Sequence, residues 1–431
     1  MRTLLVCIAL LFAAGHLFGQ TTDSTARVDS IVIPEPQTLD LQFLIAEALM
    51  NNPEIEASLR GMDVMDAKVP QAGALDDPEL KFTSENMPGF DFNQAMFRRW
   101  ELMQKIRFPS KLSAETELAA IRAEHAHHDH QEKVIEVLER LKLGYYELWY
   151  VQQNMVLTQE NIRLMDQFAK IARTKYGVGL VPMQDVLKAQ VELASLKNEL
   201  TARRQQELSA KAMLMAILNR TPKDTLGFAM IPEEVEFTST LDSLERLALN
   251  VRPMLIHDSL SVREGQAELS LAGKEYIPDF TIGIERVTSP VDGFSGWSVS
   301  AGITLPFAPW TLGKASARKD EASAEILKSQ ASYRASQAMV KASVRDHYYQ
   351  VVAAKEQLDN YRTVILPQAE QSLTASRTAY QTGTTNFLML IDAYRSLVML
   401  TKEYFMTRMQ FEQHVASLER AVGYQSLMAT R

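Results

Sequence analysis

Two similar stretches, YGVGLVPMQD at Tyr176–Asp185 and YQTGTTNFLMLID at Tyr380–Asp392, decide how this chain is organised. Tyr380 lies 204 positions after Tyr176, and Gly383 lies 204 positions after Gly179. Both stretches interrupt long helix-favouring regions. Glycine commonly ends a helix, and proline is well tolerated in the first turn of the next. We therefore expect the chain to make the same helix–turn–helix twice.

The similarity extends along most of the chain. Four further pairs of segments follow in the same order: EALMNNPEI and LALNVRPML, DDPELKFTSENMP and YIPDFTIGIERVTSP, RWELMQKIRFPSK and GWSVSAGITLPFAPWTLGK, and GYYELWYVQQN and HYYQVVAAKEQ. Ordered self-similarity of this kind indicates a duplicated structural unit. The predicted first repeat covers residues 39–220 and the second covers 241–424. An inter-repeat segment at 221–240, rich in turn formers and acidic residues, separates them.

Each repeat is predicted to be mostly helical. A medium helix comes first, and Pro53 or Pro253 would start or kink it. A long helix and a shorter returning helix complete each repeat. At 1.5 Å per residue the long helix reaches roughly 100 Å, so the glycine turns would be hairpin tips far from the rest of the repeat. The expected medium, long and returning helices are Leu41–Ala72, Ser110–Tyr176 and Pro182–Asn219, then Leu241–Gly273, Lys314–Tyr380 and Asn386–Gly423.

Two strands with a period of 2 are expected in each repeat, between the medium and long helices. Their apolar positions include Leu80, Phe82, Trp100, Leu102, Phe280, Ile282, Trp297 and Ile303, and charged or small residues alternate with these. Alternation fits a half-buried soluble sheet or a lipid-facing barrel strand. About eight strands are the minimum for a membrane barrel. A barrel would therefore need strands from several chains.

The N-terminus resembles a secretory signal peptide at residues 1–19, with Arg2 before an apolar run; an N-terminal membrane anchor is the alternative. A linker would follow at 20–38, and a short tail at 425–431. The one cysteine, Cys7, falls inside the predicted signal, so we expect no disulfide and no lipid on an N-terminal cysteine in the mature chain. The formal charge of −8 argues against a nucleic-acid partner.

Together, NNPEI…QAGALDDPEL, PDFTIGIE, YGVGLVPMQDVLKAQ and YQTGTTNFLMLIDAYRSL resemble the TolC-like outer-membrane efflux channels. The resemblance implies a mainly α fold with a small β part. It implies a homotrimer whose four strands per chain form a twelve-stranded transmembrane β-barrel in outer-membrane lipid, joined to an α-helical periplasmic tunnel with an equatorial belt. The partners it implies are a periplasmic adaptor and an inner-membrane transporter, RND-type by preference. DDPELKFTSENMPG resembles the heavy-metal and cation subgroup.

The resemblance also assigns roles at the tips. Asp392 matches an acidic residue that rings the narrow end of the tunnel, and Met389 stands where relatives often carry a second acid. Asp185 and Tyr380 match a latch between hairpins, made by the tyrosine hydroxyl. The alternatives are a solvated helix residue for Asp392 and plain helix-end packing for Tyr380. The turn residues that would meet the adaptor are Gly179, Leu180, Gly383 and Thr384.

A histidine-rich stretch, HAHHDH at 125–130, is the one candidate for metal binding. His125 with His128, and His127 with His130, have i,i+3 spacing suited to a shared metal. Since all four cannot lie on one helix face, we interpret the stretch as mainly solvated helix. We expect no resident cofactor, and no nucleophile, phosphate-loop or metalloprotease motif indicates an enzyme.

These observations favour a passive trimeric exit duct of a tripartite efflux system. The channel of a type I protein secretion system is an alternative, because the pump selects the cargo. A periplasmic coiled-coil adaptor or structural protein is a weaker alternative, since it has no need for paired strands with a lipid-compatible face.

Overall fold

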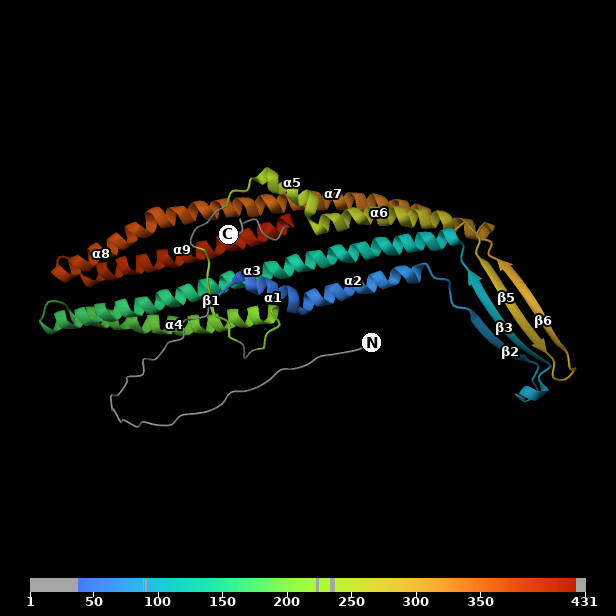
Figure 1. Cartoon of the computed structure of the whole chain (residues 1–431). Coiled ribbons are helices and arrows are strands. Elements are labelled where there is room, and N and C mark those ends of the chain that lie inside the picture. The colour runs from blue at the N-terminus through green and yellow to red at the C-terminus, as the bar shows by residue number, and fades with distance from the viewer. Residues whose placement is uncertain (1–37, 88, 90, 222–224, 233–236, 424–431) are drawn as a thin grey trace, which may run out of the picture. The chain divides into compact units, whose positions relative to one another are not determined.

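The structure is a computed structural model that describes residues 38–87, 89, 91–221, 225–232 and 237–423 (Figure 1). The predicted signal peptide, most of the predicted linker and the predicted tail lie outside the described residues. The described residues belong to one unit of the chain, which begins at Thr38.

The same order of elements occurs twice in this unit (Figure 1). The first half consists of β1 (Thr38–Leu39), α1 (Leu41–Asn51), α2 (Pro53–Ala72), β2 (Glu79–Glu85), η2 (Phe92–Gln94), β3 (Phe97–Ile106), α3 (Pro109–Gly177) and α4 (Met183–Ile217). The second half consists of β4 (Phe228–Ala229), α5 (Leu241–Val251), α6 (Pro253–Lys274), β5 (Phe280–Thr288), β6 (Ser295–Ile303), α7 (Pro309–Asn360), η3 (Tyr361–Ile365), α8 (Leu366–Thr382) and α9 (Phe387–Val422).

Proline divides each predicted medium helix into two. Asn52 and Arg252 are extended, with ψ of 122° and 121°, because the residue before proline avoids the α region. Pro53 and Pro253 then open α2 and α6, where a missing N–H costs nothing. Asn52 also caps α2, accepting from the backbone N–H groups of Glu54 and Ile55. The prediction of a single medium helix in each repeat was therefore wrong, whereas the prediction that Pro53 and Pro253 start a helix was right.

The long helix of the first repeat is continuous, whereas that of the second is not. α3 runs unbroken for 69 residues, about 100 Å at 1.5 Å per residue. The predicted single helix Lys314–Tyr380 is instead α7 and α8, joined by the π-helical turn η3. In Figure 1, α2 and α4 follow one another along α3, and α6 and α9 follow one another along α7.

The four long strands form one antiparallel sheet in the order β2-β3-β5-β6. The register aligns Leu80 with Leu102, Leu102 with Ile284, and Ile284 with Val299, so apolar side chains share one face. This face is exposed, as shown by its larger members Leu80, Phe82, Trp100, Leu102, Phe280, Ile282, Ile284, Trp297, Val299 and Ile303. The opposite face carries charge, including Arg99, which is 3.4 Å from both Glu85 and Glu285. Among the described strands, β2 and β6 each have one unpaired edge.

None of the helices in the described part of the chain carries an apolar run able to span a bilayer.

The inter-repeat segment is attached to the middle of α3. β4 pairs in parallel with β1, Thr38 opposite Phe228. The buried Tyr145 hydroxyl accepts from the Met230 N–H (2.9 Å) and donates to the Leu39 carbonyl (2.8 Å). Gln152 accepts from the N–H of Ala229 at 2.8 Å. Two side chains of one helix therefore satisfy backbone groups of both short strands.

Candidate functional site

Each hairpin tip is a glycine turn. Gly179 and Gly383 have φ of +74° and +82°, a left-handed conformation that is costly for other residues. At the first tip the Leu180 N–H donates to the carbonyl of Lys175 at 2.9 Å, and at the second the Thr384 N–H donates to the carbonyl of Ala379 at the same distance. Both bonds satisfy carbonyls that a helix end leaves open. The sequence predicted these turns correctly.

The two tips differ in chemistry. Val178 and Leu180 are 67% and 72% exposed at the first tip. The second tip presents hydroxyl groups instead, from Thr382 and Thr384. The first tip can therefore offer apolar contact and the second hydrogen bonds.

Tyr380 lies at the centre of a core that joins the two hairpins. It is 2% exposed, and its ring lies 5.5 Å from that of Phe387. The core draws on α3, α4, α8 and α9, with members Met165, Phe168, Ala169, Ala189, Leu196, Tyr380, Phe387, Leu390, Ile391 and Tyr394. The bulk of Tyr380 thus helps hold one hairpin against the other, as the packing interpretation expects.

The hydroxyl of Tyr380 is buried without a hydrogen-bond partner among the described residues. Burial raises the pKa of Tyr380 to about 12, and the nearby charge of Asp185 adds to the shift. Burial also raises the pKa of Asp185, against the opposing charge of Lys188. The structure therefore brings the two predicted latch residues near each other in one chain, without the hydrogen bond between them.

Lys175, which the sequence reasoning did not single out, joins the tips directly. Its ammonium group donates to the carbonyl of Tyr380 and, at 3.2 Å, to that of Gln381. It also lies 4.6 Å from the centre of the Tyr380 ring. These carbonyls belong to the last turn of α8, where a cation is favourable. Its position next to Tyr176 places it at a predicted tip in the sequence, but the sequence does not show what it binds, because Tyr380 lies 205 positions away.

Asp392 and Met389 lie one turn apart on α9, and both side chains are exposed. No hydrogen bond from a described residue reaches the Asp392 carboxylate, although its charge helps to raise the pKa of Arg395 after the effect of Glu192. The pair therefore forms an open acidic and apolar surface next to the second tip.

Two ion pairs connect the returning helices α4 and α9. Arg395 donates to Glu192 at 2.6 Å, and Lys402 donates to Glu199 at 2.6 Å. Burial is the largest single effect on the pKa of Glu199 and tends to raise it, but the hydrogen bonds and charges of Lys402 and Arg203 together outweigh burial, and the net shift is downward. Since the paired residues are about 203 positions apart, the sequence alone did not reveal these contacts.

The histidines of HAHHDH point to different partners. His125 is buried against α6, with Nε2 3.2 Å from Glu264 and its ring 4.3 Å from that of His257. The others form separate contacts: His127 with Asp66 (3.3 Å), His128 with Gln131 (3.0 Å) and His130 with Ser58 (2.8 Å). No group of three metal-binding side chains occurs among the described residues. The histidines that were spaced for a shared metal are therefore not brought together.

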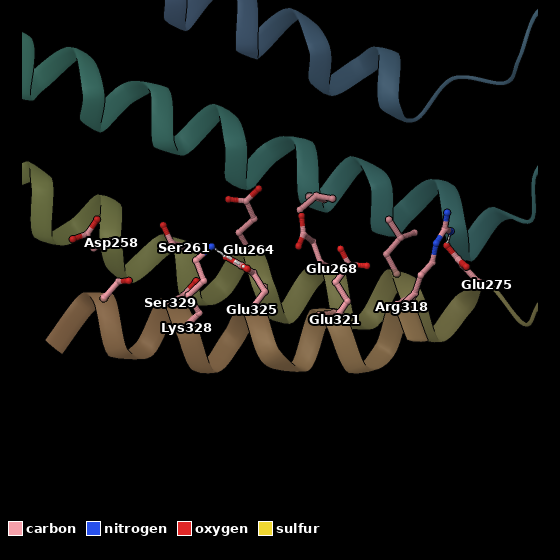
Figure 2. A pocket seen from close by; sticks show the side chains of 16 residues that line it. Asp258, Ser261, Glu264, Glu268, Glu275, Arg318, Glu321, Glu325, Lys328 and Ser329 are labelled. Carbon is pink, nitrogen blue, oxygen red and sulfur yellow. Dashed lines mark hydrogen bonds and ion pairs between the residues drawn. The ribbon is translucent and has the colours of Figure 1, made fainter. Parts of the chain in front are cut away.

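An acidic groove, of about 650 Å³, lies between α6 and α7 (Figure 2). Side chains from the two helices approach each other along it, and Leu118 of α3 closes one side. Arg318 pairs with Glu275, and Lys328 pairs with Glu325 at 2.8 Å. Arg122 of α3 pairs with Glu264 at 2.6 Å and with Glu268 at 2.9 Å. These three cations are still outnumbered by the carboxylates that line the groove, which are Asp258, Glu264, Glu268, Glu275, Glu321 and Glu325. The groove therefore has an excess of negative charge, which attracts cations.

Comparison with known proteins gives a consistent picture. A family model described as outer membrane efflux protein matches residues 44–220 and 244–424. The chain is 22% identical to the cobalt-zinc-cadmium resistance protein CzcC of Cupriavidus metallidurans, over 98% of this chain and 100% of the relative. It is 20% identical to the outer membrane efflux protein BepC of Brucella suis, over 81% and 75% of the two chains.

Solved structures share the fold. CusC matches with a TM-score of 0.76 at 17% identity, covering 89% of this chain and 92% of that chain. The outer membrane protein VceC of Vibrio cholerae matches with a TM-score of 0.73 at 18% identity, covering 89% and 96%.

Proposed function

Because the chain belongs to the outer membrane efflux protein family, we propose that three copies of it form a passive exit duct. The family is one of channel-forming efflux proteins and not of enzymes. The protein is the outer-membrane component of a tripartite efflux system, with a large periplasmic part. The trimer, the twelve-stranded barrel and the roles of single residues are the proposal.

The exposed apolar face of the sheet carries the proposal. Ten large apolar side chains face outward on four strands, and both outer strands keep an unpaired edge. In lipid every backbone polar group needs a partner, which a closed barrel provides. Four strands are too few to close one, and twelve from three chains are enough. If the free edge of β2 in one copy paired with the free edge of β6 in the next, the backbone groups would have partners and the barrel would have enough strands to close.

The duct would close at the hairpin tips. Three copies of Asp392, with Met389 one turn before, would form a charged constriction able to hold or repel cations. Tyr380 and Asp185 would latch the hairpins by a hydrogen bond in the closed tip. The turns at Gly179–Leu180 and Gly383–Thr384 would meet the periplasmic adaptor, which links the duct to an inner-membrane pump.

Cations are the proposed cargo. The relative that is matched over its whole length is a cobalt-zinc-cadmium resistance protein by name. The acidic groove between α6 and α7 would favour cations along the path. A strain lacking the gene should lose tolerance to cobalt, zinc or cadmium. Unchanged metal tolerance together with loss of secreted protein would support the secretion alternative.

The assembly can be tested by mass and by cross-linking. Detergent-extracted protein should have about three times the mass of one chain. Cysteines on the outer strands, at Thr83 and Ser298, should give covalent dimers and trimers on oxidation. The matched control places cysteines at Glu101 and Glu285, Cα partners within one chain, where oxidation should leave the mass unchanged. A monodisperse, detergent-free monomer would contradict the proposal.

A further inference from the structure

The long helices of the two repeats differ at one place. α3 is continuous, but α7 and α8 are joined by a π-helical turn at Tyr361–Ile365, where the Leu366 N–H donates to the Tyr361 carbonyl five residues earlier. Such turns are rare inside long helices and often occur at functional sites. The difference is informative because the repeats otherwise share their order of elements.

One extra residue accounts for the π-helical turn. Tyr176 follows Tyr145 by 31 positions, whereas Tyr380 follows Tyr348 by 32. Before the turn, buried Leu148 and Val151 match buried Val351 and Ala354 at an offset of 203. An added residue would rotate the rest of an α-helix by about 100°. A π-helical turn absorbs it and keeps the following side chains on the same face.

Past the turn, the matching positions follow the larger offset. Ala169 of α3 and Leu373 of α8 are 204 positions apart, and both pack in the core at the tips. Pro367 explains why the extra residue is absorbed just before it. Proline has no N–H to donate, and in an α-helix its ring would clash with the carbonyl of Thr363.

The helix beyond the turn is weakly held within its own chain. Between Leu358 and Tyr380 no described residue is buried. The matching stretch of α3 buries six: Thr158, Asn161, Met165, Phe168, Ala169 and Ala172. Segments with few buried contacts open at low free energy.

Specific contacts hold α8 at its two ends instead. At the turn, the Tyr361 hydroxyl donates to Glu403 of α9 at 3.0 Å. At the tip, Lys175 binds the carbonyls of Tyr380 and Gln381.

We propose that the π-helical turn Tyr361–Ile365 is a hinge about which α8 and the second tip move away from α3. The first hairpin, with its unbroken α3, is the fixed part. Lys175 closes the moving arm, and the bond from Tyr361 to Glu403 limits its swing. The proposed duct gives this motion a purpose, but the hinge itself does not depend on conduction.

Hydrogen exchange on the intact, detergent-solubilised protein tests the hinge without any substitution. Backbone amides at 362–366 and 368–370 should exchange at least tenfold faster than those at 158–166, the matching segment of α3. Equal protection of the two segments would overturn the proposal. Since this comparison involves no transport, it can fail while the exit-duct function stands.

A variant in which α7 and α8 form one straight helix, called the straightened variant, provides the second test. Deletion of Thr363 combined with Pro367→Ala restores the spacing of α3. Spin labels on cysteines at Leu180 and Thr384 would report the distance between the tips, because no cysteine other than Cys7 occurs in the chain. Lys175→Met should broaden this distance distribution at least twofold in the protein that keeps the π-helical turn. In the straightened variant the same substitution should leave the distribution narrow. Equal broadening in both proteins would refute the hinge.

Discussion

Replacing Lys175 with methionine should separate the two hairpin tips. The substitution keeps the length of the side chain and removes its charge and its donors. In the native protein these donors bind two carbonyls in the last turn of α8, and the ammonium group lies over the Tyr380 ring. In the Lys175→Met protein, water takes the place of the lost ammonium group as the donor to these two carbonyls.

The size of the effect follows from the geometry. A hydrogen bond involving a charged group contributes about 1.5–3 kcal/mol net, and a cation at a helix C-terminus about 0.3–1 kcal/mol. Lys175 is partly exposed, so water recovers part of this loss. We expect the joined state to lose about 1–2 kcal/mol, which lowers the ratio of joined to separated tips roughly 5–30-fold.

Planar-bilayer recordings of the purified channel are the direct assay. Lys175→Met should raise the open fraction and the mean conductance, and cells carrying it should become sensitive to large antibiotics. Lys170→Met is the matched control, because Lys170 lies in the same helix and its ammonium group pairs, among the described residues, with Asp166 four residues earlier. If the two variants conduct alike, Lys175 does not hold the tips together.

Three further predictions concern titratable groups. Asp392→Asn should weaken cation block of the closed channel in bilayers at unchanged protein yield, because three carboxylates no longer meet at the constriction. If the block is unaltered, Asp392 is an ordinary exposed residue of the helix surface. Since the pKa of Tyr380 is raised to about 12 from 10.0, the contribution of Tyr380 to the free energy of unfolding should be steady below pH 10 and fall from pH 10 to 12. Tyr380→Phe should remove about 2–3 kcal/mol of that fall in denaturant titrations. Burial, and then the charge of His257, lower the pKa of His125 in the folded chain despite Glu264. Stability should thus decline as the pH falls below about 6.5, and His125→Gln should lessen the decline in melting curves at pH 7.5 and 5.5.

Features that depend on neighbouring residues could be read from the sequence. Gly179 and Gly383 predicted the two turns, because few other residues adopt positive φ readily. Alternation along each strand predicted which side chains share a face, and the register confirms it from Leu80 to Val299. Pro53 and Pro253 marked helix starts, but the extended residues before them, which divide the medium helices, were missed.

Contacts between helices were decided only by the tertiary structure. The partner of a helical side chain depends on the rotation and axial position of two helices whose sequences lie about 200 residues apart. For that reason Lys175 was not recognised beside Tyr380, and the pairing of Arg395 with Glu192 could not be foreseen. The same cause separates the histidines at 125–130, since successive helix positions face different neighbours. The π-helical turn depends on both the sequence and the tertiary structure. The extra residue is present in the sequence, but only the packing on both sides of it decides that the helix forms a π-helical turn there, instead of rotating all the side chains that follow.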